Sequence, residues 1–270
     1  MANSVVQMRR LLPQFAAAFS LFFPKTRLSY PMNVALFVPC YVDQFFPQVG
    51  VATLELLEKL GCAVTYPTEQ TCCGQPMANA GYEHLASGCE MNVQRIFSSF
   101  EYVVTPSGSC TVHLREHLPA AHGSRIYEVC EFLTDVLRVK SLAASFPHRI
   151  GLHSSCHGLR GLRLASMSEQ NEPAFSKPIQ LLSLVDGLEL VYPERPDECC
   201  GFGGTFCVTE EAVSVKMGQD RVDEHLANNV DYIVGSDMSC LMHLQGILRR
   251  RKSNTDVLHI AQVLNAYEPA

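Results

Sequence analysis

Short apolar runs alternate along this chain with longer stretches whose apolar residues recur at helical spacing. A buried parallel strand has the first pattern and an amphipathic helix the second. The runs predict strands over 33–38, 62–66, 102–105, 149–153, 188–192, 230–234 and 256–260. The helical stretches are 49–60, 80–100, 110–117, 128–139, 178–185, 210–227 and a last helix that ends near 266. This alternation predicts parallel α/β sheets with right-handed crossovers.

The second half of the chain repeats the order of elements of the first half. The stretch 106–110 matches 235–240, and 126–133 matches 257–264. The matching parts span roughly a hundred residues or more in each half, which is typical of a duplicated domain rather than of a short solenoid repeat. We therefore expect a first domain over 32–145 and a second over 146–270.

The two halves also carry the same cysteine pattern. Each has a single cysteine, then a Cys-Cys-Gly triplet, then a cysteine followed three residues later by a histidine. The first set is Cys40, Cys72, Cys73, Cys110 and His113, and the second is Cys156, Cys199, Cys200, Cys240 and His243. All these cysteines follow the carboxyl end of a predicted strand, where open α/β sheets bind ligands, so we expect each set to meet in space.

Thiolates in sets of four are the usual ligands of iron–sulfur clusters, which makes a cluster in each repeat the leading interpretation. The glycine of each triplet lets the backbone turn and offers its amide to a sulfur, and helix amino termini nearby favour thiolates. Zinc remains an alternative, in one repeat or in both, although zinc sites usually use close cysteine pairs. Chemistry of a disulfide between adjacent cysteines is a third, weaker alternative.

His113 and His243 each lie one helical turn after a cysteine. Either they bind the metal or a cluster sulfur, or they are ordinary polar residues of a helix. His157, beside Cys156, is expected at most to support the site. The remaining cysteines have no counterpart in the other half and are expected to be small buried apolar residues: Cys62, Cys89, Cys130 and Cys207. The glycine-rich loop 201–204 lacks the spacing of a phosphate-binding fingerprint.

Composition narrows the class of protein. The chain has 270 residues, 12 cysteines and a formal net charge of −6, and 47% of its residues are hydrophobic. The negative charge argues against non-specific nucleic-acid binding, and the basic run 249–252 is expected to be the end of a helix. A domain of this size with many cysteines is better explained by reduced thiols in a cytoplasm than by disulfides.

The first 31 residues differ from the rest and contain no acidic residue. Their apolar run over 11–23 is too short for a membrane span and no cleavage motif of a signal sequence follows it. We expect a disordered or loosely helical extension whose removal leaves folding and metal content unchanged.

The cysteine pattern resembles that of the cysteine-rich CCG-domain proteins, and especially the lactate-utilisation protein A family. Related members are the B subunit of heterodisulfide reductase and the C subunit of anaerobic glycerol-3-phosphate dehydrogenase. The resemblance runs from Met32 to about Ala266, and its most specific parts are 56–62, 72–76, 106–110, 199–206 and 237–243. It implies two Rossmann-like domains with a cluster, of the 4Fe-4S type, at the carboxyl ends of the strands of each.

The resemblance further implies an electron-transfer subunit of a cytoplasmic complex that oxidises L-lactate to pyruvate. The implied partners are a ferredoxin-like iron–sulfur subunit and a third small subunit. In the heterodisulfide reductase relative the pattern ends Cys-x-x-Cys, whereas here histidine takes the last place, which puts a five-thiolate cluster in doubt. A catalytic thiol–disulfide or heterodisulfide reductase subunit and a zinc-stabilised scaffold remain alternatives. No general base for lactate oxidation stands out, so whether the chain is itself an enzyme stays open.

Overall fold

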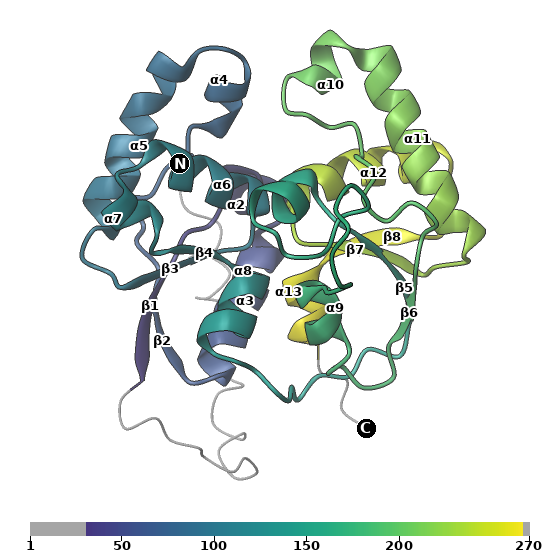
Figure 1. Cartoon of the computed structure of the whole chain (residues 1–270), viewed down its shortest axis with the longest axis horizontal. Helices are drawn as coiled ribbons and strands as arrows, with labels where there is room; N and C mark the ends of the chain where they lie inside the picture. Colours follow the sequence, from purple (N-terminus) through teal and green to yellow (C-terminus); the bar gives the residue numbers. More distant parts are fainter. Residues whose placement is uncertain (1–30, 267–270) are drawn as a thin grey trace.

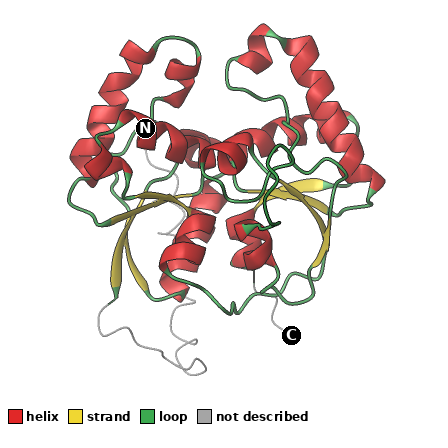
Figure 2. Cartoon of the chain, in the orientation of Figure 1, coloured by secondary structure: helices red, strands yellow, loops and turns green. Residues whose placement is uncertain are grey.

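The computed structural model describes residues 31–266, which form two four-stranded parallel sheets with helices around them (Figures 1 and 2). The first sheet has the order β2-β1-β3-β4 and the second the order β6-β5-β7-β8. The strands of the first are β1 (Met32–Leu36), β2 (Cys62–Thr65), β3 (Tyr102–Thr105) and β4 (Ile126–Glu128). Those of the second are β5 (Arg149–His153), β6 (Glu189–Val191), β7 (Tyr232–Gly235) and β8 (Asp256–His259). The predicted α/β class with duplicated parallel sheets is therefore confirmed.

Helices connect the strands in the same sequence in both halves. The first half contains α2 (Cys40–Phe45), α3 (Pro47–Lys59), α4 (Gln75–Asn79), α5 (Glu83–Phe97), α6 (Gly108–His117), α7 (Ala120–Gly123), α8 (Val129–Glu131) and the π-helix η1 (Phe132–Val136). The second contains the π-helix η2 (His157–Gly161), α9 (Lys177–Leu182), α10 (Phe206–Thr209), α11 (Glu211–Ala227), α12 (Met238–Arg250) and α13 (Ile260–Leu264). The basic run after 248 ends α12 as expected, with Arg249 and Arg250 in its last turn.

The halves share a hydrophobic core. Figure 1 shows α3, α8, α9 and α13 between the two sheets. Leu57 of α3 and Ile260 of α13 are fully buried members of one cluster that also includes Val34 and Ile150 from the two central strands. Burying such a side chain contributes about 1.5–3 kcal/mol. Because this core is continuous, the two sheets hold each other in place, while the boundary at 145/146 stays a prediction.

The connection after β3 differs from the prediction. The helix expected over 128–139 begins only at Val129, because residues 126–128 form the edge strand β4. The side chain of Glu128 ends this strand and caps the following helix, since its Oε2 accepts hydrogen bonds from the backbone nitrogens of Cys130 (2.7 Å) and Glu131 (3.2 Å). A strand of three residues has too few apolar positions for the sequence pattern to distinguish it from the helix that follows.

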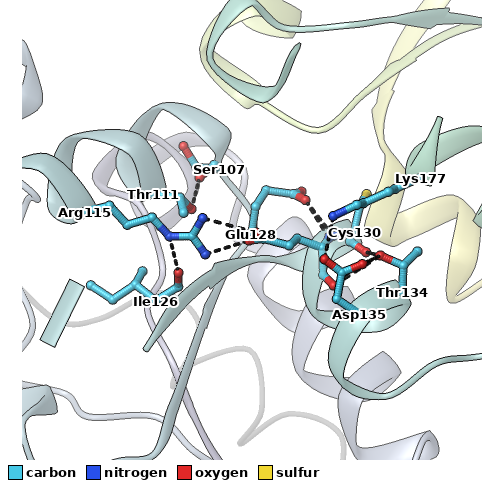
Figure 3. Close-up of polar contacts among 10 residues, drawn as sticks. Ser107, Thr111, Arg115, Ile126, Glu128, Cys130, Thr134, Asp135 and Lys177 are labelled. Carbon is cyan, nitrogen blue, oxygen red and sulfur yellow. Dashed lines mark hydrogen bonds and ion pairs between the residues drawn. The ribbon is translucent and has the colours of Figure 1, made fainter. Parts of the chain in front are cut away.

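Polar contacts around this connection also reach across the halves (Figure 3). Arg115 on α6 donates through Nε to the carbonyl of Ile126 at 2.8 Å, which fixes α6 against β4. Lys177 at the start of α9 pairs with Asp135 of η1, with Nζ and Oδ2 2.5 Å apart. An ion pair of this exposure contributes at most about 1 kcal/mol, so the shared core is the stronger link.

No helix within 31–266 has the length and apolar character needed to cross a membrane. The expectations for the first 31 residues lie, apart from Pro31, outside the described part of the chain and stay predictions.

Candidate metal centres

The four motif cysteines of the first half meet at the carboxyl end of the first sheet. Cys40 is the first residue of α2, the triplet lies between β2 and α4, and Cys110 is in the first turn of α6. The sulfurs form two close pairs: Cys40 Sγ lies 3.7 Å from Cys72 Sγ, and Cys73 Sγ lies 3.3 Å from Cys110 Sγ. Three segments that are distant in sequence thus deliver their thiols to one place, which we call the first centre.

The second half builds a matching second centre. Cys156 directly precedes η2, the triplet lies between β6 and α10, and Cys240 is in the first turn of α12. Cys156 and Cys199 lie close enough for Cys199 to raise the pKa of Cys156, and Cys200 has its pKa raised by Cys199 and Cys240. The pairing of the four sulfurs is therefore the same as in the first centre.

The glycine of each triplet has a conformation that other residues rarely adopt. Gly74 has φ 100° and Gly201 has φ 87°. A Cβ on Gly201 would lie 2.6 Å from the carbonyl oxygen of Ser214, and one on Gly74 would lie 3.0 Å from the Cβ of Ala86. In this turn the amide of Gly74 donates to Cys72 Sγ at 3.4 Å and that of Gly201 to Cys199 Sγ at 3.3 Å. Glycine is thus needed at both positions to aim an amide at a sulfur.

The close sulfurs have strongly shifted acidities. Hydrogen bonding to Cys40 and Cys73 lowers the pKa of Cys72, while the hydrogen bond with Cys72 raises the pKa of Cys40. In the second centre, Cys199 takes the lowered pKa, chiefly through its hydrogen bond with Cys156. A lowered pKa favours the thiolate, which is the form that binds a metal.

The two motif histidines lie below their centres and face protein groups. His113 Nε2 is 3.2 Å from Glu90 Oε1, and His117 Nδ1 is 3.3 Å from the same oxygen. His243 Nε2 is 3.2 Å from the carbonyl oxygen of Ser214. Burial lowers the pKa of both His113 and His243. Their assignment as additional ligands stays a prediction, and the contacts seen are those of groups that support the triplet loops.

A histidine that the sequence analysis did not single out lies at the second centre. His153 is the last residue of β5, and one of its ring nitrogens lies within 4.8 Å of the sulfurs of Cys200 and Cys240. The pKa of Cys240 is lowered to about 7, first by its hydrogen bond with Cys200 and also by His153, against the effect of burial. The available signal was its position three residues before Cys156 at the end of a predicted strand.

The four unmatched cysteines divide into two kinds. Cys62 and Cys130 are buried apolar residues, as expected. Cys89 and Cys207 are half-buried, so the expectation of full burial is wrong for them. Cys207 Sγ donates to the carbonyl oxygen of Gly204 at 3.1 Å, which holds the glycine-rich loop in its turn.

A single carboxylate joins the two centres. Asp237 is buried and its Oδ2 accepts a hydrogen bond from the backbone nitrogen of Ser109 at 2.8 Å, while its Oδ1 accepts from that of Ser239 at 3.2 Å. It therefore caps the amino termini of both α6 and α12. These helices carry Cys110 and Cys240 in their first turns, so both centres depend on the position of one side chain.

The clustered cysteine and histidine donors indicate metal binding. Tetrahedral zinc with thiolate bonds of about 2.3 Å needs sulfurs within roughly 4 Å of one another. Among residues 31–266, the groups with three donors within 4.8 Å are His153, Cys200 and Cys240, and Glu90, His113 and His117; neither contains three thiols. Cys72 interacts with Cys73 as well as with Cys40, so the four sulfurs of the first centre form one continuous group of donors.

Comparisons with known proteins agree with this geometry. The family model described as "CCG: Cysteine-rich domain" matches residues 34–115 and 150–245. "Lactate utilization protein A" of Geobacillus kaustophilus (strain HTA426) is 40% identical over 247 residues, which are 87% of this chain and 99% of that protein. The protein of the same name from Exiguobacterium sp. (strain ATCC BAA-1283 / AT1b) is 42% identical over 247 residues, 86% of this chain and 97% of its own.

A solved structure shares the fold. A hypothetical protein from Helicobacter pylori superposes with a TM-score of 0.62 at 11% identity, covering 88% of this chain and 50% of that one. At this identity the likeness concerns the fold alone.

Proposed function

Because this chain belongs to the lactate utilization protein A family of cysteine-rich CCG-domain proteins, we propose that it is the iron–sulfur electron-transfer subunit of a complex that oxidises L-lactate to pyruvate. The observation that carries the proposal is the meeting of four thiols at the carboxyl end of each sheet, with a glycine amide aimed at one of them. A bound iron–sulfur cluster supplies one-electron transfer at such a site.

The chain's own residues would hold one cluster, of the 4Fe-4S type, in each half. Cys40, Cys72, Cys73 and Cys110 are the ligands in the first centre, and Cys156, Cys199, Cys200 and Cys240 those in the second. Cys73 and Cys200 are 3% and 2% exposed, because Cys73 packs in an apolar cluster with Phe37 and Cys200 in another with Val222. Low exposure and amide hydrogen bonds tune the reduction potential of such a site.

The hollows next to the centres support a carrier rather than a lactate-binding enzyme. The hollow beside the first centre is lined by Cys40, Tyr41, Gln75 and Asp237 among others, and the one beside the second by His153, Ser154 and Ser155 among others. Neither wall contains a lysine or arginine that could bind the carboxylate of lactate. The carboxylate of Asp237 is already engaged in capping two helices.

The proposal includes partners and a compartment. A ferredoxin-like iron–sulfur subunit and a third small subunit would complete the complex, since lactate oxidation needs a site for the substrate that neither hollow offers. All the cysteines of the described chain are free thiols. Free thiols in this number favour a reducing compartment, so we place the protein in the cytoplasm.

The experiment is anaerobic purification followed by analysis of iron, acid-labile sulfide and zinc. We expect iron and sulfide, loss of one centre in Cys72→Ser, and loss of the other in Cys200→Ser. Lactate-dependent dye reduction should be absent from the isolated chain and appear when the partner subunits are added. Zinc without sulfide would favour the scaffold alternative, and turnover by the chain alone would refute the carrier assignment.

A further inference from the structure

We propose that His153 contacts the metal of the second centre, that the first centre has no such contact, and that the second centre therefore has the higher reduction potential of the two. The inference rests on the proposed function insofar as both centres hold iron–sulfur clusters. It concerns residues in which the two halves differ.

Strand register identifies the residue of the first half that corresponds to His153. In the first sheet Val34 pairs with Tyr102, and in the second Ile150 pairs with Tyr232. β1 and β5 occupy the same place in their sheets. Three residues after Val34 and Ile150 are Phe37, which directly follows β1, and His153, which ends β5. Both lie three residues before the first motif cysteine, Cys40 or Cys156, so the same backbone position carries phenyl in one half and imidazole in the other.

The imidazole of His153 is buried, and the protein group placed to accept a hydrogen bond from it is the sulfur of Cys240. The residue is 3% exposed, and neither ring nitrogen has a hydrogen-bonding nitrogen or oxygen in the described chain. A buried polar group left unpaired destabilises the folded state. The groups that face it are the sulfurs of Cys199, Cys200 and Cys240 and the ring of His225. An imidazole has two ring nitrogens, so a metal bound at these thiols would give a partner to a nitrogen that Cys240 does not engage.

The first centre has an apolar wall at the same place. Phe37 is fully buried and packs edge-on against Phe97, with ring centroids 5.7 Å apart. A phenyl ring can neither coordinate a metal nor donate a hydrogen bond to a sulfur. At the position that His153 takes in the second half, the first half therefore offers neither a metal ligand nor a hydrogen-bond donor from a side chain.

A second difference has the same effect. The triplet glycine packs against Ala86 of α5 in the first half and against Ser214 of α11 in the second. Four residues later in each helix the first half has Glu90 and the second has Gly218. Glu90 brings a carboxylate next to His113 beneath the first centre, whereas the space at Gly218 is taken by the ring of His243, which lies 2.7 Å from a Cβ built there.

These differences predict the order of the two potentials. A neutral imidazole that replaces negative charge, or an N–H that donates to a sulfur, favours the reduced state of a cluster. A nearby carboxylate opposes the addition of an electron. The carboxylate of Asp237 lies at the amino termini of α6 and α12 and is therefore common to both centres. The second centre gains the imidazole of His153 and lacks a counterpart of Glu90, so it is the centre that is easier to reduce.

The test is His153→Phe, which installs the residue of the first half, measured in the full-length protein with both centres loaded under anaerobic conditions. Redox titrations followed by electron paramagnetic resonance should resolve two potentials. Cys72→Ser and Cys200→Ser, each expected to lose one centre, assign them. In His153→Phe the higher potential should fall and the lower one should stay unchanged. His148→Phe, a change of a partly exposed histidine just before β5, is the matched control and should move neither.

A nitrogen readout separates contact from general packing. In the wild-type protein, pulsed resonance of the second centre should show coupling to a histidine nitrogen, which His153→Phe and His153→Gln should both abolish. If His153→Phe folds poorly, His153→Gln gives the same comparison of potentials, and loss of iron from the second centre alone also supports a contact. Unchanged potentials and unchanged nitrogen coupling in either folded variant would overturn the inference.

Failure of the proposed function has a different signature. Protein that contains zinc and no sulfide would refute the electron-transfer role. His153 would then be tested by the zinc affinity of the second centre, which His153→Phe should reduce if the contact exists and leave unchanged if it does not.

Discussion

Replacing Asp237 by alanine is expected to weaken both centres at once. The side chain accepts four hydrogen bonds: from the backbone nitrogens of Ser109 and Ser239, from Ser239 Oγ at 2.7 Å and from Ser107 Oγ at 3.3 Å. Loss of one helix cap costs about 0.5–2 kcal/mol. Two caps in a buried place therefore give a loss of roughly 2–4 kcal/mol in the free energy of unfolding.

Asp237→Ser separates the two caps. The residue that faces Asp237 in the first half is Ser107, whose hydroxyl accepts from the backbone nitrogen of Cys110 at 3.2 Å and so caps its own helix. A serine at 237 can do the same for α12 and is too short to reach Ser109. We expect Asp237→Ser to lose about half as much stability as Asp237→Ala, roughly 1–2 kcal/mol.

The assay is thermal unfolding of the metal-loaded protein without oxygen, at one scan rate, with iron release followed in parallel. A loss of 1 kcal/mol lowers Tm by about 2–4 °C in a chain of this size, so Asp237→Ala should unfold roughly 5–15 °C earlier. Asp220→Ala, which removes a surface ion pair with Lys216, should stay within about 2 °C. Wild-type stability in Asp237→Ser would refute the claim that the carboxylate stabilises α6 across the halves.

Two further predictions concern the buried carboxyl group and the triplet glycine. Burial raises the pKa of Glu128 from 4.5 to about 8, so the folded state holds the proton more tightly and stability should fall as pH rises from about 5 to 8. In the wild-type protein the free energy of unfolding should fall by up to about 1.4 kcal/mol per pH unit over this range, and Glu128→Gln should abolish that fall. Denaturant titrations at a series of pH values measure it, and parallel wild-type and variant curves would contradict the prediction. A residue other than glycine at the positive φ of Gly201 costs roughly 1–2 kcal/mol. Gly201→Ala should cost more than that, because its Cβ would also meet the carbonyl oxygen of Ser214, and iron content and Tm measure the loss. Gly61→Ala, with φ 91° and open space around its Cβ, carries the φ cost alone, and equal losses in the two variants would show that the close approach is harmless.

The positions of the eight motif cysteines could be predicted from the chain because they depend on local order. Apolar runs locate the strands, and parallel strands end at one edge of a sheet, so cysteines after Leu36 and Thr105 must lie near each other. The triplet glycines could be interpreted in the same way, since a turn toward a sulfur needs a left-handed residue. The number of residues between two motif cysteines does not affect whether they meet, because the sheet topology brings the strand ends together.

Features set by contact between the halves were not predictable in this way. His153 was missed because a comparison of the repeats looks for identical residues, and its counterpart is Phe37. The role of Asp237 depends on α6 and α12 beginning next to each other, which follows from the packing of one sheet against the other. Glu128 was assigned to a helix because three apolar and polar residues do not distinguish a short edge strand from a first helical turn.

The residues that the two halves share hold the sulfurs in place, and the residues in which the halves differ lie around those sulfurs. The cysteines and the triplet glycines are the same in both, because their geometry decides whether four sulfurs can meet at all. The pairs Phe37 and His153, and Glu90 and Gly218, lie one layer further out and leave the sulfurs in place while changing the charge and hydrogen bonding around them. Two identical centres would have equal potentials and give an electron no preferred site. If the proposed electron-transfer role holds, a duplicated scaffold that differs in this outer layer would give two sites of the same shape and different potential, as a carrier between two redox partners needs.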